Sequence, residues 1–169
     1  MNRVWGSALV VAGLVFTLGG AASWGGGPPN PTPSDAAFNT AGGSDALINN
    51  NSYSNTGFGD SVLKNNHGEG NTAIGAFTLT FNTDGIYNTA SGFFSLLRNT
   101  TGFYNTASGA WALNNNTTGN NNTASGFHAL AGNSTGFRNT ASGVDALRDN
   151  TTGASNIALG YQAPAARQR

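Results

Sequence analysis

Residues 88–143 read NTASGFFSLLRNTTGFYNTASGAWALNNNTTGNNNTASGFHALAGNSTGFRNTASG, and the phrase Asn-Thr-Ala-Ser-Gly starts again every 17 residues. In the same frame, related units lie upstream as far as Asn39 and downstream as far as Asn156, with the first two units one residue shorter. Eight units therefore fill residues 39–163, and the last is truncated. A short fixed period is typical of a solenoid, in which stacked neighbours bury a shared core.

The columns of the repeat indicate which residues form that core. The first position of each unit is Asn and the fifth is Gly, while the ninth position is Leu in all complete units. We predict a leucine core and an asparagine ladder with amide-to-amide hydrogen bonds between coils. The core leucines are Leu47, Leu63, Leu79, Leu96, Leu113, Leu130 and Leu147, and the ladder is Asn39, Asn55, Asn71, Asn88, Asn105, Asn122, Asn139 and Asn156.

Turn residues set the expected shape of each coil. Gly and Asn tolerate positive φ, and they recur at the fifth position and from the twelfth to the fifteenth. Two corners per unit predict two short strands per coil, and the high Gly, Asn and Thr content disfavours helix. The predicted fold is all-β: a parallel β-solenoid (β-roll) of eight coils of 16–17 residues, the last truncated. At about 4.8 Å per coil it forms a rod of roughly 40 Å.

The first strand leaves a choice of which residues face inward. Positions two and four are apolar at Ile157 and Leu159 but Thr or Ser in most units, whereas position three is Ala in seven of eight units. We expect positions two and four to point inward and the Ala column to form a flat outer face. Aromatic residues at positions six and seven are expected to cover one edge or form a contact patch.

Composition excludes several classes of function. Charged residues are 8 % of the chain, the formal net charge is zero and cysteine is absent. This predicts no nucleic-acid partner, no disulfide framework and no thiolate metal site. The periodic apolar columns favour an ordered chain over a disordered one.

The chain before the repeats divides into two segments. Residues 1–22 carry one positive charge, a short apolar run and small residues, as in a secretory signal peptide. The run is shorter than a spanning helix needs, so we expect no membrane span after signal removal, and a secreted, extracellular or cell-surface location. Residues 23–38 are rich in Pro and Gly and are read as a linker or as an arm that docks on a neighbouring subunit. Residues 164–169 form a C-terminal tail.

The motif NTAxGxxAL with an NTTG corner, and the closing NIALGYQA, resemble the β-roll repeats of trimeric autotransporter adhesin heads and related bacterial and phage surface fibres. The resemblance covers residues 39–163 and implies that Ile157 and Leu159 are an inward apolar pair. The chain shows neither the heptad stalk nor the C-terminal barrel of that family, so trimerisation and anchoring are not carried over.

Titratable residues are too sparse to suggest catalysis. Asp145 and His128 share column seven in adjacent coils, and His67 lies near Glu69, but each pair is better explained as solvated side chains. The acids are also too scattered to supply the oxygen ligands of calcium. We predict no enzyme activity, no catalytic residue, no metal and no cofactor.

The leading hypothesis is an exported structural protein that self-assembles head-to-tail into a filament. The repeats show no polar cap, and the last coil stops near Ala163, so open strand edges are expected at both ends. Candidate assembly residues are Trp24, Pro29, Pro31, Phe38, Ile157, Leu159 and Tyr161. The alternatives are an adhesin-like module, trimeric or monomeric, that binds a host or environmental surface, and binding of ice or another crystal face through a regular Thr array.

Overall fold

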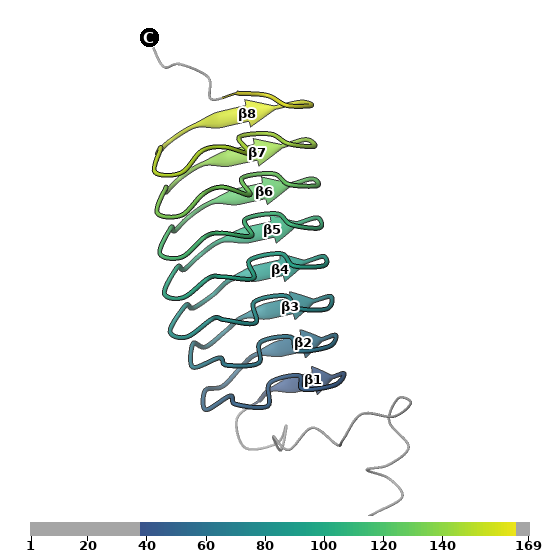
Figure 1. Cartoon of the computed structure of the whole chain (residues 1–169). Coiled ribbons are helices and arrows are strands. Elements are labelled where there is room, and N and C mark those ends of the chain that lie inside the picture. The colour runs from purple at the N-terminus through teal and green to yellow at the C-terminus, as the bar shows by residue number, and fades with distance from the viewer. Residues whose placement is uncertain (1–37, 165–169) are drawn as a thin grey trace, which may run out of the picture.

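The computed structural model describes residues 38–164, and in that part the chain winds into a rod of stacked coils (Figure 1). Strand β1 lies at one end and β8 at the other. The predicted all-β parallel β-solenoid is confirmed, and the described residues contain no helix. The predicted signal peptide and nearly all of the arm and the tail lie outside the described residues.

Each coil contributes one three-residue strand to a single eight-stranded parallel sheet. Neighbouring strands pair in strict register, so that residues of one column face each other, as Thr89 faces Thr106 and Ala90 faces Ala107. The strands are β1 Thr40–Gly42, β2 Thr56–Phe58, β3 Thr72–Ile74, β4 Thr89–Ser91, β5 Thr106–Ser108, β6 Thr123–Ser125, β7 Thr140–Ser142 and β8 Ile157–Leu159.

The prediction of two strands per coil is wrong, because the other side of each coil is a run of turns. Positions seven and nine adopt positive φ, with the column of leucines at 47° to 53°. Such angles are rare for residues with a side chain and interrupt an extended strand. The turns nevertheless pair with their neighbours, as when Leu96 N–H donates to the Ala112 carbonyl at 3.0 Å. Inter-coil hydrogen bonds therefore continue around the coil without a second sheet.

The core lies between the sheet and these turns. All seven leucines of position nine are 0 to 5 % exposed, and the small residues of position eight pack beside them. Burying one Leu side chain contributes about 1.5 to 3 kcal/mol, which offsets the cost of about 1 to 2 kcal/mol for its left-handed backbone. Gly at position five is required by contact as well as by φ: a Cβ at Gly109 would lie 2.6 Å from the Gly126 carbonyl oxygen.

Two asparagine ladders run through the interior. In the position-one ladder, each side-chain oxygen accepts the backbone N–H of the next Asn along the rod, as from Asn39 to Asn55 and from Asn139 to Asn156, at 2.8 to 3.0 Å. From Asn71 onward, the next side-chain amide also donates to that oxygen. The second ladder lies at position twelve, where amides bond directly at 2.6 to 2.8 Å. The buried amides are thereby paired along the whole rod.

Candidate functional site

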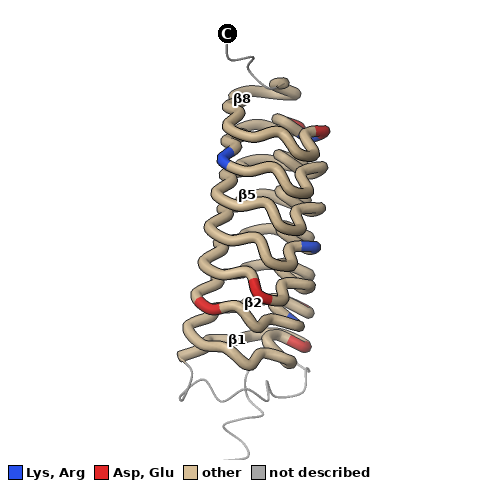
Figure 2. Tube along the Cα trace, turned by 90° about the vertical axis from the view of Figure 1, so that its left-hand side faces the viewer, with Lys and Arg blue, Asp and Glu red and all other residues tan. Residues whose placement is uncertain are grey.

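The outer face of the sheet is a regular surface that runs along the described rod. It consists of the residues at positions two and four of β1–β8, and we name it the Thr–Ser face. Position two is Thr in β1 to β7, and position four is Ser in β4 to β7. In β4 to β8 the two outer residues are exposed and the central Ala is buried. No strand contains a charged residue, and Figure 2 shows how few charges the described rod carries.

This arrangement overturns the expected direction of the first strand. Positions two and four point outward, and the Ala column points inward, with Ala90, Ala107 and Ala124 at most 1 % exposed. Ile157 and Leu159, expected as an inward pair, are 58 % and 70 % exposed. The physical reason is space: at position three of β2, a Cβ added to Gly57 would lie 3.1 Å from Val62 and 3.6 Å from Leu63. A methyl group fits against that interior wall, and a larger side chain does not.

The hydroxyl groups of the Thr–Ser face have no hydrogen-bond partner within the described residues. A second Thr column, at position thirteen, behaves differently. Its Oγ1 atoms donate to backbone carbonyls of the next coil, from Thr83 to Thr100, from Thr100 to Thr117 and from Thr117 to Ser134, at 2.9 to 3.0 Å. The hydroxyls of the Thr–Ser face, unlike those of position thirteen, are therefore available to an external ligand.

Aromatic rings line the edge where the chain leaves the sheet, at positions six and seven. We name this surface the aromatic edge; it consists of Phe77, Phe93, Phe94, Trp111, Phe127 and His128. The position-seven rings follow one another from coil to coil, with centroids 5.3 Å apart for Phe77 and Phe94 and 4.6 Å apart for Phe94 and Trp111. Phe93 and Phe127 are each 45 % exposed, so this edge offers apolar surface to a partner.

The pair His128 and Asp145, considered from the sequence, does lie together. His128 Nδ1 is 3.4 Å from Asp145 Oδ1, and Arg148 Nη1 is 3.8 Å from the same oxygen. Arg148 also hydrogen-bonds Asp149, which raises the pKa of the guanidinium and lowers that of the Asp149 carboxyl. These groups form a small polar cluster between neighbouring coils, and its Asp145 Oδ1 atom is buried without a hydrogen-bond partner among the described residues.

A second polar cluster joins neighbouring coils near the N-terminal end of the rod. The Tyr87 hydroxyl donates to Glu69 Oε1 at 3.0 Å. Hydrogen bonding to Glu69 raises the pKa of both Tyr53 and Tyr87, because ionised phenolates would face the carboxylate. His67, predicted to lie near Glu69, forms no hydrogen bond or ion pair with it among the described residues.

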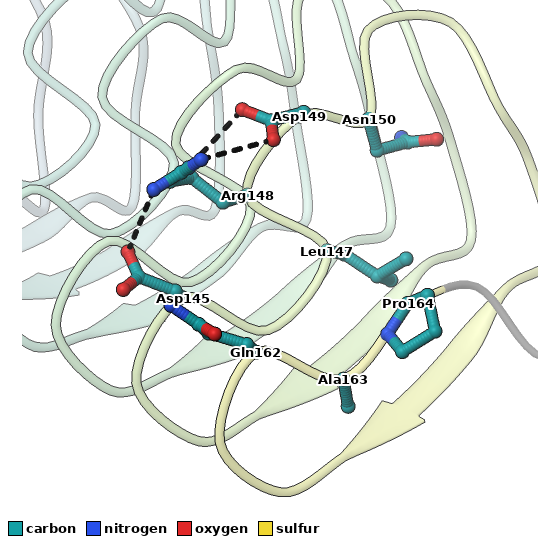
Figure 3. A pocket seen from close by; sticks show the side chains of 8 residues that line it. All are labelled: Asp145, Leu147, Arg148, Asp149, Asn150, Gln162, Ala163 and Pro164. Atoms are coloured by element: carbon teal, nitrogen blue, oxygen red, sulfur yellow. Dashed lines mark hydrogen bonds and ion pairs between the residues drawn. The ribbon is translucent and has the colours of Figure 1, made fainter.

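A hollow of about 450 Å³ lies at the C-terminal end of the described rod (Figure 3). It is lined by Asp145, Leu147, Arg148, Asp149, Asn150, Gln162, Ala163 and Pro164. In earlier coils the corresponding surface is covered by the following coil, which is why Leu147 is 5 % exposed and the other core leucines 0 %.

The predicted assembly residues are only partly described. Trp24, Pro29 and Pro31 lie outside the described residues. Phe38 precedes the first coil and is 78 % exposed, and Tyr161 in the last coil is 71 % exposed. Sequence reasoning missed the Thr–Ser face, although a signal was present. Position three is always small, as a crowded interior requires, whereas position four is Gly, Phe, Ile, Ser or Leu and position two changes from Thr to Ile157, as an outer surface tolerates.

Comparisons with known proteins give no relative: no protein-family model, no curated protein and no solved structure matches this chain. Within residues 38–164, no group of three or more His, Cys, Asp or Glu side chains is close enough to hold a metal ion. The same residues contain no helix with the length and hydropathy needed to cross a membrane.

Proposed function

We propose that the chain is an exported structural rod that joins end to end into an extracellular or cell-surface filament. The proposal rests on one observation. The two ends of the described rod present the same two sets of groups that bind each other between neighbouring coils in its interior.

At the β8 end, the groups that would continue the stack are in place. Each Thr at position two of β1 to β7 donates its N–H to the Asn carbonyl of the next coil at 2.8 to 2.9 Å. Ile157 occupies that position in β8, and within the described residues its N–H has no coil beyond it. A Cβ at Gly160 would meet nothing within 4 Å, whereas a Cβ at Gly143 would lie 2.3 Å from the Gly160 carbonyl oxygen. The space above Gly160 is thus the space that a further coil occupies elsewhere.

At the β1 end, Asn39 presents the complementary groups. In the interior, an Asn carbonyl accepts from the preceding coil, and an Asn N–H donates to the preceding Asn Oδ1, as from Asn55 to Asn39 at 2.8 Å. The Asn39 carbonyl and N–H would meet Ile157 N–H and Asn156 Oδ1 of another copy in the same way. The hollow lined by Pro164 leaves room for residues of the second copy at the contact between the two rods.

This kind of contact favours a filament over a closed oligomer. A head-to-tail contact is heterologous, and it closes only when its rotation brings the chain back on itself. Strand addition also supplies main-chain hydrogen bonds without demanding new side chains. The in-register sheet repeats by near-translation from β1 to β8, so stacked copies would extend along the rod axis.

Electron microscopy of the purified chain tests the proposal. We expect fibres whose length increases with protein concentration, and short single rods for Ile157→Pro, because Pro removes the outward N–H and is tolerated at the first residue of a strand. Ala154→Pro is the matched control: its N–H donates no backbone hydrogen bond, so fibres should persist. Discrete particles from the parent chain, or undiminished fibres from Ile157→Pro, would reject end-to-end assembly.

A second candidate is an adhesin-like binding module, and the exposed aromatic edge favours it. Exposed rings such as Phe93 and Phe127 are common at protein contact surfaces. Under this alternative, sedimentation and microscopy should show discrete particles of one length, containing one or three chains. Replacing Phe93 and Phe127 by Ser should then abolish attachment or trimer formation while leaving the β-sheet circular dichroism unchanged.

A further inference from the structure

The Thr–Ser face combines three properties that bear on what can bind it. The first is freedom from charge: all eight strands lack Lys, Arg, Asp and Glu. An uncharged surface gives no attraction to phosphate, to anionic lipid or to an acidic or basic peptide. The occupant that fits is itself uncharged.

The second property is a set of uncommitted hydroxyls. In β4 to β7, every strand places one Thr and one Ser outward, and none of these eight hydroxyls bonds to another described residue. An uncharged occupant that satisfies them must offer both donors and acceptors over the whole face. Each Thr also presents a methyl group beside its hydroxyl, so the surface alternates hydrogen-bonding and apolar points.

The third property is a two-dimensional lattice. Registered parallel pairing places equivalent hydroxyls on neighbouring strands, as in Thr106↔Thr123 and Ser108↔Ser125. Strands repeat at about 4.8 Å, and positions two and four are separated by roughly 6.6 Å along a strand. The Thr column continues without interruption from Thr40 to Thr140, that is, through seven strands. A periodic surface selects a periodic ligand, since many weak contacts then form at once.

We propose that the Thr–Ser face binds the surface of ice. Ice is uncharged, each of its water molecules both donates and accepts hydrogen bonds, and its shortest lattice repeat is close to the strand spacing. The Thr methyl groups fit between lattice waters, while the hydroxyls take lattice positions. Neutral polysaccharide fits less well, because among the described strands this face carries a single aromatic ring, Phe58 in β2, and β4 to β7 offer none against which a sugar could stack. The inference is independent of filament assembly, because it uses the side of the rod and not its ends.

Ice growth in the presence of the purified chain tests the inference. The parent chain should inhibit recrystallisation of polycrystalline ice and produce thermal hysteresis. Thr106→Tyr, in the middle of the face, should reduce both effects by about tenfold or more, because one protruding ring lifts neighbouring hydroxyls off the lattice. Thr118→Tyr is the matched control: Thr118 is exposed on a turn in the same coil, and its substitution should leave the effect unchanged.

Circular dichroism at the assay temperature establishes that both variants are folded. Absence of any effect of the parent chain on ice overturns the inference. Equal activity of Thr106→Tyr and Thr118→Tyr overturns it as well. If Thr106→Tyr instead converts an oligomer into single chains while the parent chain leaves ice growth unaltered, the face is a contact between copies and the ice inference is wrong.

Discussion

Two columns of threonine run along the rod, and they use their hydroxyl groups differently. At position thirteen, Thr100 and Thr117 donate to backbone carbonyls of the next coil at 2.9 and 3.0 Å. At position two, Thr89 and Thr106 are exposed, and their hydroxyls have no partner within the described residues. The same residue type at the same period therefore holds coils together on one side and remains available on the other. The difference lies in the backbone: a turn brings a carbonyl within reach of the side chain, and a strand directs the side chain away from the sheet.

The asparagine columns extend this comparison to the interior. Their side-chain amides form hydrogen bonds with an Asn in an adjacent coil, with the Gly carbonyl of position fifteen, or with both. Asn99, for example, donates to Asn82 Oδ1 and to the Gly102 carbonyl. Polar groups within the rod are thus stabilising only when the neighbouring coil supplies a partner.

The largest effect should come from placing an unpaired amide inside the rod. Leu113→Asn removes a fully buried side chain and leaves a polar group where the surrounding column is apolar. We expect loss of folding, since the lost apolar contact costs about 2 to 5 kcal/mol and the unpaired amide about 1 to 3 kcal/mol more. Circular dichroism and thermal unfolding measure it, with Thr123→Asn on the outer face as control. A Leu113→Asn chain as heat-resistant as the parent would mean that the column faces water.

A smaller loss is expected when a paired amide is removed. Asn99→Ala leaves Asn82 Oδ1 without its donor and takes one acceptor from the Asn116 amide. The free energy of unfolding should fall by about 1 to 3 kcal/mol, read from the urea midpoint. Thr101→Ala, at an exposed neighbouring position, should change it by less than about 0.5 kcal/mol. Equal midpoints for the two variants would show that the ladder does not contribute.

One buried hydroxyl breaks the pattern and gives an effect of opposite sign. Ser95 Oγ is buried and has no hydrogen-bond partner among the described residues, whereas Thr78 in the same column donates to the Gly92 carbonyl at 2.7 Å. Ser95→Ala should therefore stabilise the chain by about 1 kcal/mol, and Ala already occupies this column at Ala112 and Ala129. Thr78→Ala, which removes a satisfied group, should destabilise it. If Ser95→Ala proves destabilising, Ser95 has a partner that the structure does not show.

The fold could be predicted from the sequence because a repeat of fixed length indicates stacked coils. A leucine that returns in every complete coil must face a shared interior, and the asparagine column must find partners in its neighbours. The direction of the strand was encoded less directly, because only the constantly small residue at position three indicates it. Ile157 and Leu159 suggested an inward apolar pair, but the space left beside Leu63 and Val62 admits only the small residue between such positions.

The second side of the coil was also beyond sequence reasoning. Nothing about a leucine such as Leu96 or Leu113 indicates a left-handed backbone, because leucine disfavours positive φ. These residues adopt it here because neighbouring coils hold the turn in place. The free hydroxyls of the Thr–Ser face could not be predicted for a similar reason. Whether Thr89 or Thr100 has a free hydroxyl depends on where the next carbonyl lies, and the spacing of residues along the chain does not contain that distance.

The most direct test compares two double variants that remove the same hydroxyls from the two columns. Thr100→Val with Thr117→Val deletes two inter-coil hydrogen bonds, and Thr89→Val with Thr106→Val deletes two outward hydroxyls of the same shape. We predict that thermal unfolding of the first variant shifts down by about 3 to 8 °C, corresponding to about 1 to 2 kcal/mol, while the second unfolds within about 1 °C of the parent. Equal shifts in the two variants, or a larger shift in the second, would contradict the division between hydroxyls that hold the coils together and hydroxyls left available for binding.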